Sequence, residues 1–179
     1  YKGSNTYLFY INGWNGINID ACPGSMKKFK RLRPRDINLE IGIGEKEDIL
    51  TYYLIDKGST MNSFSKEYLQ SIGMFESVKE KIPVKILPLA SVLDQYASAF
   101  DRIDILSIDV EGFDMEVITS NDWTKYRPRV IVIELNSRNI NDLATNETAK
   151  YLCNLGYEIV SKTVVLPDVA SVFFVDKEF

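Results

Sequence analysis

Histidine is absent from the 179 residues, and cysteine is scarce. Without histidine the chain has no Ser-His-Asp or Cys-His mechanism and no histidine-ligated metal site. Any acid–base chemistry must therefore come from carboxylates, lysine, tyrosine or cysteine.

The two cysteines are too few for a disulfide framework and form no Cys-x-x-Cys motif. We expect Cys22 and Cys153 to be buried thiols in a reducing cytoplasm. Long apolar runs are also missing: none reaches the length of a membrane span, and no charged-then-apolar leader opens the chain. The sequence therefore predicts a cytoplasmic protein without membrane attachment.

Basic residues are slightly outnumbered, with 21 Lys and Arg against 25 Asp and Glu, which gives a net charge of −4. An acidic chain is a poor binder of nucleic acid or anionic membranes. The basic residues of segment 26–35 are better explained as the solvated face of an amphipathic helix. Apolar residues make up 45% of the chain, enough for one globular domain over residues 1–179.

Short apolar runs alternate with helix-like segments, a pattern typical of an α/β domain with a largely parallel sheet. The last two strands are separated by a short turn, so the final strand should be antiparallel. Ser4 and Pro23 are expected to begin the first two helices. Strands are expected at 17–20, 37–43, 49–55, 84–87, 103–110, 130–134, 157–165 and 170–176, and helices at 4–11, 23–32, 65–72, 89–96, just after 114, and 142–155.

Three of the expected strands end in a carboxylate: Asp20, Asp109 and Glu134. Ligands of open parallel sheets bind at the carboxyl ends of the strands, so these acids are candidates for a binding site. Asp20 could accept both ribose hydroxyls of a nucleoside. It could equally be the N-cap of the helix expected near Pro23, and the spacing favours neither interpretation.

The most informative stretch is Ser-Ile-Asp-Val-Glu-Gly-Phe-Asp at residues 107–114. Repulsion between Asp109 and Glu111 should raise at least one carboxyl pKa and make one of them a usable base. The alternative is a solvated turn in which Asp114 or Glu111 begins a helix. We favour a functional turn because Asp109 is flanked by residues that prefer burial.

Six motifs follow one another along the chain, at residues 4–7, 13–20, 33–38, 62–64, 107–112 and 127–134. Together they resemble the FkbM-type family of S-adenosylmethionine-dependent methyltransferases. The resemblance implies a Rossmann-like class I methyltransferase fold. This fold is a three-layer sandwich of strand order 3-2-1-4-5-7-6 around a mostly parallel sheet, with an antiparallel C-terminal hairpin. It also implies O-methylation of a hydroxyl on a sugar or natural-product-type small molecule.

The resemblance also implies roles for individual residues. Asp20 would hold the ribose hydroxyls of S-adenosylmethionine, and Gly42 and Ile43 would lie near its adenine. Asp109 would face the methionine end and the methyl group, as both a cofactor-binding and a catalytic residue. Glu111 would sit at the substrate side, and we expect it to act as the catalytic base. The methyl acceptor is expected to be a small molecule or glycan. Loops 56–63 and 135–141 are expected to form its binding site.

A metal site is an alternative role for part of this set. Asp109, Glu134 and Asn136 resemble the residues with which some related O-methyltransferases hold Mg²⁺, an ion that prefers oxygen ligands. Glu134 could instead cap or hydrogen-bond backbone groups. Mg²⁺ is therefore the less favoured of the two cofactors.

The sequence departs from the family pattern at its beginning. The first strand of the family, with its Asp-x-Gly-Ala-Asn turn around the cofactor, should precede Ser4, where only three residues stand. We expect an N-terminally incomplete domain with further residues upstream. The competing hypothesis is a non-catalytic binding or structural domain of the same fold that lacks a competent cofactor site.

Overall fold

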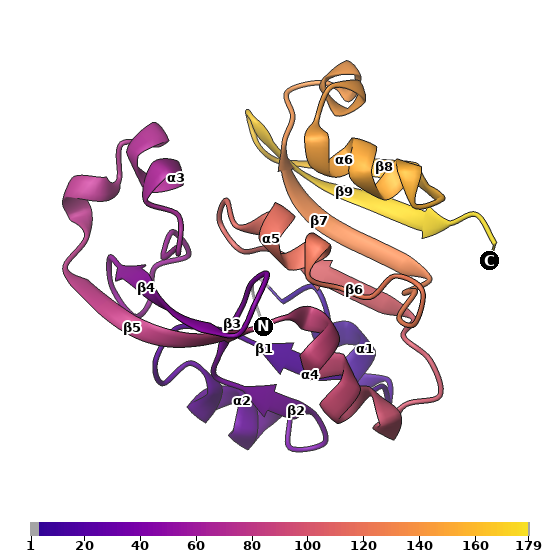
Figure 1. Cartoon of the computed structure of the whole chain (residues 1–179), viewed down its shortest axis with the longest axis horizontal. Coiled ribbons are helices and arrows are strands. Elements are labelled where there is room, and N and C mark those ends of the chain that lie inside the picture. The colour runs from indigo at the N-terminus through magenta and orange to yellow at the C-terminus, as the bar shows by residue number, and fades with distance from the viewer. Residues whose placement is uncertain (1–3, 179) are drawn as a thin grey trace. The chain divides into compact units, whose positions relative to one another are not determined.

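The computed structural model describes residues 4–178, so the strand expected before Ser4 lies outside the described residues. The chain falls into two compact units. Unit 1 comprises residues up to 96 together with 110–120, and unit 2 comprises 97–109 and 121–179. Figure 1 shows the elements of both units.

Unit 1 contains a short parallel pair, β1 (Ile17–Ile19) with β2 (Ile37–Leu39), in the register Ile17 to Ile37. Helices α1 (Tyr7–Ile11) and α2 (Met26–Leu32) precede these two strands in turn. This pair matters for function because the chain leaves β1 directly at Asp20, whose N–H still donates to the Leu39 carbonyl.

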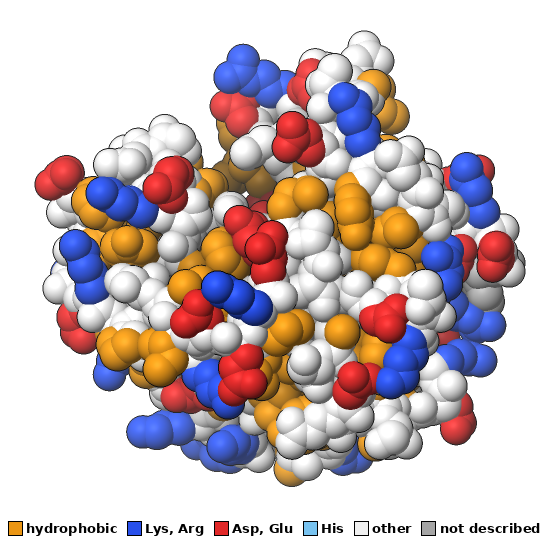
Figure 2. Space-filling model, viewed as in Figure 1, with side chains coloured by type: hydrophobic (Ala, Val, Ile, Leu, Met, Phe, Trp, Pro, Cys, Tyr) orange, Lys and Arg blue, Asp and Glu red, His pale blue; other side chains and the backbone are white. Residues whose placement is uncertain are grey.

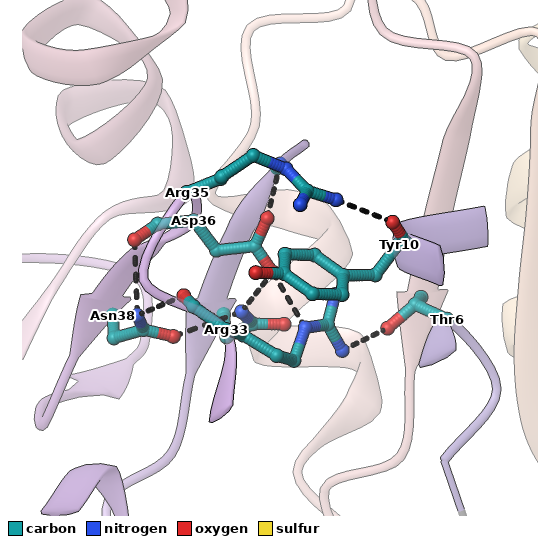
Figure 3. Close-up of polar contacts among 8 residues, drawn as sticks. Thr6, Tyr10, Arg33, Arg35, Asp36 and Asn38 are labelled. Atoms are coloured by element: carbon teal, nitrogen blue, oxygen red, sulfur yellow. Dashed lines mark hydrogen bonds and ion pairs between the residues drawn. The ribbon is translucent and has the colours of Figure 1, made fainter. Parts of the chain in front are cut away.

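A buried polar cluster around Asp36 holds this part of unit 1 together (Figure 3). The Asp36 carboxylate accepts hydrogen bonds from Arg33 Nε at 2.6 Å, Asn18 Nδ2 at 2.8 Å and the Gly16 N–H at 3.0 Å. Arg33 also donates to the Thr6 hydroxyl at 2.9 Å. One carboxylate therefore joins the start of β1 to the segment that enters β2.

The second sheet of unit 1 has the order β3-β5-β4, with β3 (Gly42–Ile43), β4 (Asp48–Leu54) and β5 (Glu80–Leu87). The expectation of one strand over 37–43 was wrong, because the chain breaks at Glu40 and β3 pairs parallel with β5 instead. Pro83 is tolerated inside β5 because the two-residue β3 reaches only Ile86 and Leu87, which leaves that edge open at the proline.

Four helices complete unit 1: α3 (Lys66–Ser71), the 3₁₀ turn η1 (Phe75–Ser77), α4 (Leu89–Tyr96) and α5 (Asp114–Thr119). Helix α4 has the bounds expected from the sequence and buries Leu89, Val92 and Leu93, an i, i+3, i+4 stripe. Ser65 begins α3 as its N-cap by accepting the Tyr68 N–H.

Unit 2 is a four-stranded sheet of order β6-β7-β9-β8. Its strands are β6 (Ile105–Ile108), β7 (Val130–Asn136), β8 (Tyr157–Leu166) and β9 (Val169–Asp176), accompanied by η2 (Ala97–Ala99), η3 (Ile140–Ala144) and α6 (Glu147–Asn154). Strands β6 and β7 are parallel, whereas β9 is antiparallel to both of its neighbours. The expected antiparallel C-terminal hairpin is therefore confirmed.

The core of unit 2 comes from strict alternation along β7 and β9. Ile131, Ile133, Val172 and Phe174 are fully buried, and their neighbours along each strand are less so. The buried Tyr157 ring belongs to the same core, and its hydroxyl donates to the Pro128 carbonyl at 2.7 Å.

Three expected helix boundaries were wrong. The first helix begins at Tyr7 after Thr6, not at Ser4, and the second begins at Met26 because Gly24 adopts a positive φ of 87°. The helix expected over 142–155 is two helices, because the Asn146 side chain accepts the Ala149 N–H and starts α6.

The surface carries charges of both signs, interspersed on the face seen in Figure 2. Cys22 is buried as expected, but Cys153 is exposed on α6, so that part of the thiol prediction was wrong. Within residues 4–178 no helix has the length and apolar character needed to cross a bilayer.

Candidate functional site

Asp20 sits just past the end of β1, half-buried, and closes a tight local turn. Its Oδ1 accepts the N–H of Cys22 at 2.8 Å. Helix α2 begins only at Met26 with Ser25 as its N-cap residue, so the alternative in which Asp20 caps this helix was wrong. The turn therefore holds the Asp20 carboxylate in place, and Asp20 does not cap the start of α2.

The charges of Asp20 and Glu111 both act on the hydroxyl group of a buried tyrosine, Tyr52. Burial raises the pKa of Asp20, and the hydrogen bond from Cys22 opposes this shift. Burial also raises the pKa of the Tyr52 hydroxyl, and the charges of Asp20, Cys22 and Glu111 add to it. Unit 1 therefore brings Asp20 and Glu111 into the surroundings of one aromatic side chain.

Gly42 and Ile43, the residues expected near adenine, form the short strand β3 and are buried. A Cβ on Gly42 would lie only 2.6 Å from the Phe64 ring and 2.7 Å from Ile86. Glycine is therefore required here by packing, and Gly42 could meet a ligand only through its backbone. The contact with adenine stays a prediction.

Glu111 occupies a strained turn at the start of the 110–120 segment. Its φ of 51° is the left-handed conformation that side-chain-bearing residues rarely adopt, and Gly112 follows with a φ of 82°. The Glu111 carbonyl accepts the Ser63 hydroxyl at 2.7 Å, and Oε2 accepts the Tyr68 hydroxyl at 2.6 Å. Strain held by such contacts is typical of functional turns.

Sequence reasoning missed Tyr68 altogether. Tyr68 lies 43 residues before Glu111 in a helix with no motif of its own, so only the folded chain reveals the pair. Ser63 did carry a signal, because it belongs to the segment 62–64 of the resemblance.

Asp109, Glu134 and Asn136 belong to unit 2. The parallel register that places Ile108 beside Ile133 also brings Asp109 next to Glu134. Asp109 is exposed at the strand end, yet desolvation by the protein atoms around its carboxyl raises its pKa, and a hydrogen bond with Glu134 opposes the shift.

Two of the three residues predicted to hold Mg²⁺, Asp109 and Glu134, lie within hydrogen-bonding reach of each other. Two neighbouring carboxyl groups can share a proton or bind a cation. Among residues 4–178 no three acidic, cysteine or histidine side chains are grouped so as to bind a metal. The predicted set has only two acids and takes Asn136 as its third ligand, so its use by Mg²⁺ stays a prediction.

The loop expected to shape the acceptor site borders a shallow hollow in unit 2 of about 400 Å³. The Arg138 guanidinium pairs with Asp168 at 2.6 Å, and the Asn139 and Asp142 side chains cap η3 reciprocally. A polar lining of this kind suits hydroxyl groups, but its use by an acceptor stays a prediction. The lining residues are Asn136, Ser137, Arg138, Asp142, Thr145, Asn146 and Asp168.

Comparison with known proteins gives one match. The family model described as the methyltransferase FkbM domain matches residues 1–159 of the chain. Comparisons with curated proteins and with solved structures gave no match. Because the family model covers most of the 179 residues, the chain belongs to the FkbM methyltransferase family.

Proposed function

We propose that the protein transfers a methyl group from S-adenosylmethionine to a hydroxyl oxygen of a sugar or natural-product-type small molecule. Membership of the FkbM methyltransferase family supports methyl transfer in general. The observation that carries the finer proposal is the Glu111 carboxylate, held in a strained turn of unit 1 by the Tyr68 hydroxyl, in the same unit as Asp20 beyond β1.

The proposed fold is the Rossmann-like class I sandwich. Its strand order 3-2-1-4-5-7-6 contains the neighbours 3-2 and the run 4-5-7-6, which correspond to β2-β1 and β6-β7-β9-β8. The antiparallel orientation of β9 agrees with the seventh strand of that order. Strands β4 and β5 were predicted, at 49–55 and 84–87, but their sheet with β3 lies outside that order.

Asp20 is the proposed ribose ligand. Its Oδ1 already accepts the Cys22 N–H, which fixes the carboxylate direction before any ligand arrives. Carboxylate oxygens are acceptors that match the two hydroxyl donors of a ribose. The proposed contact between Asp20 and the ribose therefore rests on the two carboxylate oxygens and on their fixed position past the end of β1.

Glu111 is the proposed base. Bound S-adenosylmethionine supplies an electrophilic methyl group on a positively charged sulfur, which becomes a neutral thioether after transfer. The acceptor hydroxyl loses its proton to the Glu111 carboxylate as its oxygen forms the new bond to carbon. The rigid turn would keep this carboxylate aligned with the acceptor oxygen during the transfer.

The test is Glu111→Gln, which removes the basic oxygen and keeps the shape of the side chain. We expect kcat to fall by roughly 10²–10⁴, with binding of S-adenosylhomocysteine retained, in an assay of labelled methyl transfer to a panel of hydroxylated acceptors. Activity should persist in excess chelator, since the proposed transfer uses no metal ion.

Glu76→Gln in η1 is the matched control, because it makes the same chemical change in unit 1 outside the proposed site. It should leave both kcat and S-adenosylhomocysteine binding unchanged. Undiminished turnover in Glu111→Gln would refute the assignment of the base. Failure of the wild-type protein to bind S-adenosylhomocysteine would support the non-catalytic alternative.

A further inference from the structure

We propose that Tyr68 is a positioning residue for methyl transfer: its hydroxyl holds the Glu111 carboxylate in the orientation from which that group accepts the acceptor's proton. The inference rests on the proposed function, because it takes Glu111 as the base. It assigns a role to a residue that neither motif nor strand-end position indicates.

The contact itself is short and charge-assisted. The Tyr68 hydroxyl donates to Glu111 Oε2 at 2.6 Å, within the 2.5–2.7 Å range of strong O–H···O⁻ bonds. Both side chains are half-buried, so competition from water is reduced. Hydrogen bonds to charged groups of this kind are roughly twice as strong as those between neutral groups.

The same segment of chain holds the backbone of the turn. Ser63 is 1% exposed and is joined to Tyr53 of β4 by backbone hydrogen bonds in both directions. Its hydroxyl donates to the Glu111 carbonyl and accepts the N–H of Ser65, the N-cap of α3. Residues 63–68 therefore fix Glu111 at two atoms, its carbonyl oxygen and its carboxylate.

Packing of the Tyr68 ring explains why this contact is directional. A Cβ on Gly112 would lie 2.6 Å from Cγ of the ring, so the tyrosine lies directly against the turn. The ring is thereby restricted, and its hydroxyl is placed at Oε2. Glu111 keeps its positive φ of 51° in this setting, because contacts on both sides compensate for the strain.

A fixed carboxylate contributes to rate rather than to binding. A freely rotating Glu111 would place its basic oxygen along the line to the acceptor only part of the time, which lowers kcat. Affinity for the cofactor product and the acceptor would change little, because Tyr68 is proposed to act on the base alone.

The test is Tyr68→Phe, which keeps the ring against Gly112 and removes only the hydroxyl. We expect kcat to fall about ten-fold or more, with the acceptor KM and the Kd of S-adenosylhomocysteine unchanged. A second readout needs no activity: the ¹³C resonance of the Glu111 carboxyl carbon, identified by its loss in Glu111→Gln, should shift in Tyr68→Phe at fixed pH.

Tyr53→Phe is the control, because it removes a tyrosine hydroxyl from β4 in the same unit while its ring still packs on Phe75. It should leave kcat and the Glu111 carboxyl resonance unchanged. An unshifted resonance in Tyr68→Phe would overturn the proposal, and so would equal losses of kcat and S-adenosylhomocysteine affinity. A shifted resonance in a protein without methyl transfer would support the contact and refute the proposed function instead.

Discussion

Single side chains in unit 1 are held before any ligand is present. Asp20 is oriented by the Cys22 N–H, and Glu111 by Tyr68 and Ser63. Pre-arranged groups lose less conformational entropy when a ligand binds, so more of the interaction energy appears as affinity or rate. The role of Glu111 is tested by its effect on kcat, and the role of Asp20 by its effect on cofactor affinity.

For Asp20 the expected effect is on cofactor affinity. Asp20→Ala should weaken S-adenosylmethionine binding by roughly 1.5–3 kcal/mol, the range for a hydrogen bond to a charged group, as measured by titration calorimetry. Folding should stay nearly intact, because α2 does not depend on this residue for its cap.

Asp56→Ala provides the comparison, because the Asp56 carboxylate also accepts a local N–H, that of Gly58 at 2.7 Å. It should lower stability about as much as Asp20→Ala does, without weakening cofactor binding. Equal affinities for Asp20→Ala and wild type, with a matching loss of stability, would mean that Asp20 is only structural.

Gly112 and Gly73 form a pair that separates backbone strain from side-chain crowding. Both have a positive φ, but a Cβ on Gly73 would meet nothing within 4 Å, whereas on Gly112 it would meet the Tyr68 ring. Gly73→Ala should therefore cost about 1–2 kcal/mol in urea denaturation. Gly112→Ala should cost about 1–3 kcal/mol more than Gly73→Ala. Equal losses would show that the ring can move away from the turn.

Side-chain hydrogen bonds reinforce the parallel pair β1 and β2. Each strand has only three residues, so the ladder between them is short. Asp36 supplies additional contacts by accepting from Arg33, Asn18 and Gly16. These contacts fix the strand from which Asp20 emerges.

Removal of the Asp36 charge should therefore be strongly destabilising. The Asp36 side chain is 0% exposed and that of Arg33 is 8% exposed. Asp36→Asn leaves this buried guanidinium without its counter-charge, which should cost about 3–5 kcal/mol in urea denaturation. Asp104→Asn, at a partly exposed carboxylate that pairs with Arg102 and Arg129, should cost below about 1 kcal/mol. Similar losses for both would argue against a structural role for the Asp36 cluster.

For the whole molecule, stability in acid should depend on the ion pair at the end of the chain. The hydrogen bond from Arg127 holds the pKa of Asp176 below its ordinary value, although burial opposes the shift. A carboxyl whose pKa is lower in the folded state stabilises it above the unfolded pKa of about 3.9. That contribution is lost as the pH falls through the folded pKa.

Asp176→Asn removes this titrating group. At pH 7 it should destabilise the protein by about 1.5–3 kcal/mol, and the gap from wild type should shrink as the pH falls below about 4. Urea denaturation from pH 7 to pH 3 measures this difference. Glu158→Gln, at an exposed pair with Lys177, should differ little from wild type across that range. A gap for Asp176→Asn that stays constant with pH would refute the linkage.

Local pattern was sufficient for some elements. A continuous β-branched run predicted a strand over 130–134, where β7 lies, and the expected helix over 89–96 is α4. The carboxylates at the strand ends were identified as site candidates for the same reason, since a strand and the acid after it are adjacent in sequence.

Contacts between distant segments could not be read from the chain. The break of 37–43 into β2 and β3 depends on pairing of Gly42 with Ile86, and the setting of Glu111 depends on Tyr68. The two residues of each pair are more than 40 positions apart in the sequence. They come into contact only when the chain folds, so no local pattern indicates the pair. Sequence therefore supplied the strands, the acids and the family, whereas folding supplied the partners that orient the acids.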